Sequence, residues 1–189
     1  MAVIKSKAHG KPHLVGLSLG SSLILKLLEK HSSLIDKVLV DGASPQPIKG
    51  YRKIIAIVYL MSFLKNTKFV ANLLTKMMQE DGAPVQDVQR FVTDFQRASR
   101  GSFRRAMTQA NLLRLDLQFN NPAFFVSGGK EAETIHDWHS RLAHKNARSE
   151  WAYYPDKGHA WLFSDVDTHI QLLRYFFQNA AFPEKLKGF

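Results

Sequence analysis

The sequence contains no cysteine, which excludes disulfide bonds, cysteine-ligated zinc and catalysis by a thiol. It also lacks a long apolar run. The longest, residues 54–64, is interrupted only by Ser62 and is too short for a bilayer, which takes about 20 apolar residues. Residues 1–16 lack the uninterrupted apolar core of a signal peptide. These absences predict a cytoplasmic protein with no membrane span.

Acidic residues are scarce, since 16 Asp and Glu stand against 26 Lys and Arg, for a net charge of +10. A basic balance can indicate nucleic acid, a membrane surface or acidic substrates as partners. The positive charges are spread along the chain, with one denser stretch from Arg90 to Arg114. No nucleic-acid-binding motif accompanies that stretch, so we interpret it as a solvated helix face and expect no nucleic-acid partner. A basic nucleic-acid binder that uses this stretch is the third alternative.

Hydrophobic residues make up 45% of the 189 residues, which is typical of one globular domain, with room for a small inserted subdomain. Apolar runs and helical periodicity alternate along the chain. Expected strands cover residues 13–17, 37–40, 123–126 and 151–154, and expected helices cover 19–30, 51–64, 68–79, 84–101, 102–115, 132–145 and 166–179. This order predicts an α/β fold: a parallel sheet of about four strands with flanking helices. Residues 1–47 and 118–189 would form its core, and residues 48–117 an inserted helical cap.

The segment Gly16-Leu17-Ser18-Leu19-Gly20 matches the G-x-S-x-G nucleophile elbow. A serine on a strained turn between a strand and a helix exposes its hydroxyl. Side chains at both flanking glycine positions are expected to collide across that turn. The helix that follows directs its N-terminus at the site, so the backbone N–H of Leu19 is the expected oxyanion donor. An apolar strand before Ser18 and an amphipathic helix after it provide the context that this motif requires.

A general base and an acid complete the candidate set. His159 follows Gly158 in a loop beyond the last expected strand, from which it can reach back to accept the Ser18 proton. In the chain order serine, acid, histidine, the acid belongs after the strand 123–126, where Glu131 lies. Asp41, at the end of the preceding strand, is the alternative.

Two further groups of residues are candidates for other roles. His136 and His139 lie three apart on an expected helix, with Glu133 three residues before His136, a spacing that could bind a metal. No third clustered ligand is evident, so we interpret them as an exposed polar face and expect neither metal nor cofactor. The aromatic residues of the cap are predicted either to line an acyl pocket or to form the core of the cap; they are Tyr59, Phe63, Phe69, Phe91 and Phe95.

The strings HLVGLSLGSSLILKLL, KVLVDGAS, PAFFVSGGKE and YYPDKGHAW resemble the α/β-hydrolase fold family, and most of all its small bacterial esterase-like members with a helical cap. The resemblance covers nearly the whole chain. It implies a Ser-His-acid triad, no cofactor, and hydrolysis of an ester, amide or related bond in a small-molecule substrate. By this resemblance the triad residues are Ser18, His159 and Glu131, although a glutamate departs from the aspartate usual at that position.

A further departure is that only residues 1–11 precede the expected elbow strand, whereas the family has four more strands there. We therefore expect the C-terminal part of a hydrolase, with an unpaired strand edge through which the protein could self-associate. The first hypothesis is an esterase-like hydrolase. The alternative is an inactive remnant that binds a ligand or partner.

Overall fold

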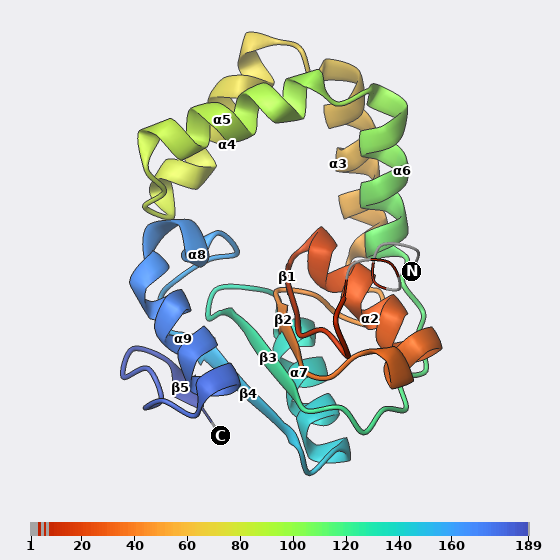
Figure 1. The fold of residues 1–189 in the computed structure, drawn as a ribbon. Helices are drawn as coiled ribbons and strands as arrows, with labels where there is room; N and C mark the ends of the chain where they lie inside the picture. Colours follow the sequence, from red (N-terminus) through yellow and green to blue (C-terminus); the bar gives the residue numbers. More distant parts are fainter. Residues whose placement is uncertain (1–3, 5, 7, 189) are drawn as a thin grey trace.

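Five strands form one sheet in the computed structural model, which describes residues 4, 6 and 8–188 (Figure 1). In their order across the sheet, the strands are β1 (Leu14–Leu17), β2 (Val38–Asp41), β3 (Ala123–Gly128), β4 (Ser149–Tyr154) and β5 (Lys187–Gly188). β1 to β4 are parallel, and β5 pairs antiparallel with β4. β2 and β3 are buried along their whole length, and strands buried on both faces carry continuous apolar runs.

Helices cover both faces of this sheet. α2 (Leu19–His31) and α7 (Glu133–Lys145) pack on one face, and α8 (Trp161–Ser164) and α9 (Val166–Gln178) pack on the other. Successive side chains of a strand point to opposite faces. Phe125 accordingly joins the core under α2 and α7, whereas Phe124 joins the core under α8 and α9.

Residues 51–111 form four helices that rise from the sheet as an arch (Figure 1), which we call the helical arch. The helices are α3 (Tyr51–Leu64), α4 (Lys68–Glu80), α5 (Val85–Arg97) and α6 (Arg100–Asn111). α3 packs against α6, and α4 against α5. At the α4–α5 turn, Met78, Ala83 and Val88 form a small cluster with Phe163 of α8. The arch is therefore connected to the sheet region at both of its ends.

The order of strands and helices confirms the α/β fold expected from the sequence. The structure differs in three additional short elements and in the ends of some helices. β5, α8 and the short 3-10 helix Ser32–Leu34 had no sequence signal, because each is only two to four residues long. Pro84 is the N-cap of α5 and not its first residue, and the helix ends at Arg97. Among the described residues, no helix combines the length and apolar character needed to cross a membrane.

A buried serine connects β1, α2 and β2. The hydroxyl of Ser21, in the first turn of α2, donates to the Gly16 carbonyl at 2.6 Å and accepts the Asp41 N–H at 2.8 Å. It also lies 2.9 Å from the Asp41 carbonyl. Ser21 is fully buried, so water cannot replace these bonds if the hydroxyl is removed.

We expect Ser21→Ala to lower the free energy of unfolding by about 1–3 kcal/mol, because it leaves buried backbone groups without their partner. Urea denaturation followed by circular dichroism would measure the loss. Ser33→Ala is the matched control, because Ser33 is exposed. Equal stability of both variants would contradict the connecting role of Ser21.

Candidate active site

The turn between β1 and α2 holds Ser18 in a strained backbone conformation. Ser18 has φ 54° and ψ −111°, a positive φ that residues other than glycine rarely adopt. A Cβ at Gly16 would lie 2.6 Å from backbone atoms of Gly20 and Ser21, so only glycine fits there. A Cβ at Gly20 would meet nothing within 4 Å, so the expectation that both flanking positions exclude side chains is wrong for Gly20.

The surroundings of Ser18 fix its backbone. Its N–H donates to the Asp41 carbonyl at 2.8 Å, and its carbonyl accepts the Ser22 N–H at 3.0 Å. Leu19 is the first residue of α2, where backbone N–H groups have no partner within the helix. The Leu19 N–H is thus available to an oxyanion that forms beside Ser18.

His159 and Glu131 form a close pair. His159 Nδ1 lies 2.6 Å from Glu131 Oε2, while Glu131 Oε1 accepts the Gly128 N–H at 2.9 Å. The Glu131 side chain is only 5% exposed and that of His159 is 48% exposed. Gly42, at φ 64°, lies against the imidazole: a Cβ there would be 2.7 Å from the ring. Glu131 and Gly42 therefore hold the Nδ1 side of the imidazole, and Nε2 has no hydrogen bond to a described residue.

The pKa values of this pair shift in opposite directions. Burial alone lowers the pKa of His159, but the hydrogen bond and charge of Glu131 raise it, and the net shift is upward. Burial raises the pKa of Glu131, but the hydrogen bond and charge of His159 lower it, and the net shift is downward. Each group therefore favours the charged form of the other.

Asp41, the alternative acid, is in a different environment. It is fully buried, its Oδ1 accepts the Trp161 indole N–H at 3.2 Å, and its Oδ2 has no hydrogen-bond partner. Burial and the charge of Glu131 raise the pKa of Asp41 well above its ordinary value of 3.8, against the opposing effects of Trp161 and His159. The environment of Asp41 therefore favours its protonated form. Asp41 anchors Trp161, and it makes no hydrogen bond to His159 in the described structure.

Ser18, Glu131 and His159 line one cavity of about 300 Å³ at the carboxyl ends of the strands. Ligands in open α/β sheets bind at these ends. The hydroxyl of Ser18 makes no hydrogen bond to His159 among the described residues, and such bonds are often long before a substrate is bound. The apolar wall of the cavity has two sides. Ile48, Ile54, Met107 and Ala110 come from the arch and its flank, and Leu19, Ala43, Ala132 and Ile135 come from the sheet side.

The aromatic residues of the arch do not line this cavity, so the acyl-pocket interpretation of them is wrong. Phe63 and Phe69 are among the most exposed apolar side chains of the described chain, and Tyr59 and Phe91 are also exposed. Phe95 packs edge-on against Phe103, with 4.9 Å between ring centroids. Aromatic content alone could not indicate which side of each arch helix faces the cavity.

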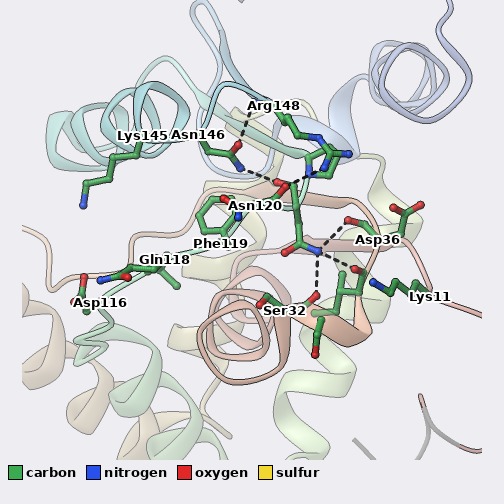
Figure 2. Close-up of a pocket in the computed structure, with 15 residues that line it drawn as sticks. Lys11, Ser32, Asp36, Asp116, Gln118, Phe119, Asn120, Lys145, Asn146 and Arg148 are labelled. Atoms are coloured by element: carbon green, nitrogen blue, oxygen red, sulfur yellow. Dashed lines mark hydrogen bonds between the residues drawn. The ribbon is translucent and has the colours of Figure 1, made fainter.

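A larger hollow, of about 870 Å³, lies at the opposite, amino ends of the strands (Figure 2). Loops that precede the strands line it with polar side chains, and these already bond to one another. Asn121 Nδ2, for example, lies 2.7–3.2 Å from the carbonyls of Ser32, Ile35 and Asp36. We interpret this hollow as a junction of loops.

His139 of α7 has a structural role. His139 is fully buried, and its Nε2 donates to the Ala43 carbonyl at 2.9 Å, next to Gly42. Burial lowers its pKa to about 4, so it is neutral near pH 7. The expectation of an exposed polar face is therefore wrong for His139. No cluster of three or more potential metal ligands occurs within the described part of the chain.

One contact near the site had no sequence signal. Asp81, at the α4–α5 turn, lies so close to Gly158 that a Cβ there would be 2.6 Å from a carboxylate oxygen. The charge of Asp81 also contributes to the raised pKa of His159. Asp81-Gly82 is an ordinary turn sequence, so only the folded arch brings it to the histidine loop.

Known structures share the fold of this chain. The chain is similar to an α/β-hydrolase enzyme from a Medee basin deep-sea metagenome library, with 15% identity, TM-score 0.70, and 95% of this chain and 70% of that one covered. It is also similar to the enol-lactonase from Burkholderia xenovorans, with 14% identity and TM-score 0.70, and 89% of this chain and 66% of that one covered. A third similar structure is a thermophilic esterase from Thermogutta terrifontis, with 14% identity and TM-score 0.67, and 90% of this chain and 65% of that one covered. No family profile and no curated protein match the sequence. The chain has the α/β-hydrolase fold.

The first prediction of the site concerns the pKa of His159. Glu131→Gln removes the negative charge that raises this pKa, so the imidazole should titrate at a lower pH, which NMR of the ring protons would detect. Glu133→Gln is the control, because Glu133 is exposed on the same segment and makes no ion pair in the described structure. An unchanged His159 titration in Glu131→Gln would refute the pairing.

The same pair sets a pH window of stability. The pKa of His159 is raised, so its contribution is full at low pH and is lost as the pH rises through the native pKa. The pKa of Glu131 is lowered, so its contribution is lost as the pH falls through the native pKa. The pair therefore stabilises the fold most between these two pKa values.

A second prediction concerns Asp41. The native protein keeps a proton on Asp41 that the unfolded chain releases above about pH 4, so native stability falls as the pH rises from there towards the raised native pKa. Asp41→Asn has no proton to lose, and we expect a flatter pH dependence in urea unfolding. Asp137→Asn, on the exposed side of α7, should keep the wild-type dependence. Identical curves for all three proteins would show that buried Asp41 is not protonated.

Proposed function

We propose that this chain is a serine hydrolase of the α/β-hydrolase type that cleaves a small ester or related acyl bond through Ser18, His159 and Glu131. One observation carries the proposal: Ser18, at positive φ on a strand-to-helix turn, lines the same cavity as the hydrogen-bonded His159–Glu131 pair. The hydrolase fold, shared with an esterase and an enol-lactonase, supports it.

In the proposed mechanism, Ser18 Oγ attacks the carbonyl carbon while its proton passes to His159 Nε2. The Leu19 N–H stabilises the oxyanion, and Glu131 stabilises the imidazolium. The bond to the leaving group then breaks, and His159 donates its proton to the leaving oxygen. Water, deprotonated by His159, cleaves the acyl-serine and restores Ser18. Every step uses side chains and backbone of this chain.

The cavity favours a short acyl group. Its volume of about 300 Å³ is at the lower limit of small-molecule sites, and its apolar wall includes Ile54 of α3 and Met107 of α6. We propose that residues 48–117 act as the cap that supplies one side of this wall, and that residues 1–47 and 118–189 form the catalytic core.

A second candidate function is an inactive hydrolase-like protein that binds a partner. The outer edge of β1 favours it, because β1 pairs with β2 alone among the described strands, and Val15 on it is 48% exposed. An unpaired strand edge is a template for pairing with another chain, including a second copy.

Hydrolysis assays separate the two candidates. We expect a fluorophosphonate probe to label Ser18 and the protein to hydrolyse p-nitrophenyl acetate and butyrate slowly. Among the described residues, the elbow supplies one clear oxyanion donor, the Leu19 N–H, and each further donor typically adds about a hundredfold in rate. Activity should rise with pH through the pKa of His159, because the base must be neutral to accept a proton.

The control for background reactivity is Ser18→Ala, which should lose both labelling and turnover. Ser22→Ala removes a neighbouring hydroxyl of the same cavity that bonds to the Ser18 carbonyl, and it should retain most of both. Labelling of wild type and Ser18→Ala to the same extent would exclude Ser18 as the nucleophile. Specific labelling without turnover would favour the second candidate.

A further inference from the structure

Exposed apolar side chains are concentrated on the helical arch. Nine of the fifteen large apolar side chains that are exposed in the described chain lie between residues 51 and 111. Four of them lie on α3, and three of these four lie close together towards its end, where Tyr59 is 50%, Leu60 59% and Phe63 69% exposed. Large apolar side chains grouped at a surface commonly mark a binding site.

Two arginines of α6 lie over the aromatic rings of this group. The guanidinium of Arg100 is 5.7 Å from the Phe63 ring centroid, and that of Arg104 is 5.0 Å from the Tyr59 ring centroid. Both arginines are exposed, and neither forms an ion pair with a carboxylate of the described chain. We call these two arginines, with Tyr59, Leu60 and Phe63, the α3–α6 patch.

The charge around the patch has one sign. α3 and α6 contain no aspartate or glutamate, and their basic residues are Arg52, Lys53, Arg100, Arg104 and Arg105. A second copy of this chain would bring like charges together, so charge complementarity selects an anionic partner. Helices that present Phe and Leu beside Arg and Lys bind the interface of anionic bilayers, where apolar side chains enter and cations meet lipid headgroups.

We propose that the α3–α6 patch docks the protein on an anionic lipid surface. The patch and the cavity share one side of α6, since Arg100 and Arg104 precede Met107 by seven and three residues, which is helical spacing for one side. In Figure 1, α3 and α6 stand together as one leg of the arch above the sheet. Docking there places the leg that walls the cavity against the lipid. The binding step does not depend on the proposed hydrolase activity.

Co-sedimentation with vesicles tests this proposal. We expect the full chain to bind phosphatidylcholine vesicles that contain phosphatidylglycerol, and not vesicles of phosphatidylcholine alone, with weaker binding as salt rises. Arg100→Gln and Arg104→Gln should each weaken binding about fivefold, the usual effect of one basic residue at such a surface. Leu60→Ser and Phe63→Ser should each weaken it about tenfold, because an inserted apolar side chain is lost.

Matched controls lie outside the arch. Arg141 of α7 lies over the Trp138 ring at a similar distance, 5.5 Å from the centroid, and Leu23 of α2 is exposed like the patch leucine. Arg141→Gln and Leu23→Ser should therefore bind as wild type does, and circular dichroism would verify that every variant is folded.

Three results would overturn the proposal. The first is that the wild type does not sediment with phosphatidylglycerol vesicles. The second is that the arginine variants lose binding while Leu60→Ser and Phe63→Ser keep it, which would indicate general attraction to polyanions. The third is that, without vesicles, sedimentation velocity shows a dimer that the patch variants dissociate.

Discussion

The close crossing of β1 and the first turn of α2 is the constraint on which the candidate site depends. Gly16 lies so close to the backbone of Gly20 and Ser21 that a Cβ there would be 2.6 Å away, and Ser18, in the turn between them, has a positive φ. A strained residue persists only where its surroundings over-determine it. Here the Ser21 hydroxyl binds backbone groups of β1 and β2, and the Asp41 carbonyl holds the Ser18 N–H.

The parallel sheet then assembles the remaining groups. Ser18 follows β1, Gly42 follows β2, Glu131 follows β3 and His159 follows β4, so all four lie at the carboxyl ends of the parallel strands. The two carboxyl groups near His159 are both buried and differ in their hydrogen bonds. Glu131 has a backbone N–H and the imidazole to stabilise its charge, whereas Asp41 has only the Trp161 indole. A carboxylate that accepts more hydrogen bonds is more stable in its ionised form, so Glu131 ionises more readily than Asp41.

These strand-end positions could be predicted from the sequence, because the elbow pattern and apolar runs are local signals. The burial of His139 could not, since its partner, the Ala43 carbonyl, is distant in sequence. The approach of Asp81 to Gly158 likewise depends on the fold of the whole arch. Helical periodicity indicated the arch helices correctly. It could not decide whether the arch aromatic residues line a pocket or form the core of the cap, because a strongly apolar helix such as α3 has no single side that sequence alone assigns to the core.

The helical arch buries few apolar side chains of its own. α6 has no fully buried residue, and α3 buries only Val58 and Ser62. Lys65, next to α3, is 1% exposed, and its ammonium donates to the Gln96 carbonyl at the end of α5 and to Asn66. Segments with few buried apolar side chains open at lower free energy than the core. The arch can therefore open at lower free energy than the elbow, and because its α4–α5 turn lies against Gly158, such opening would change the surroundings of His159.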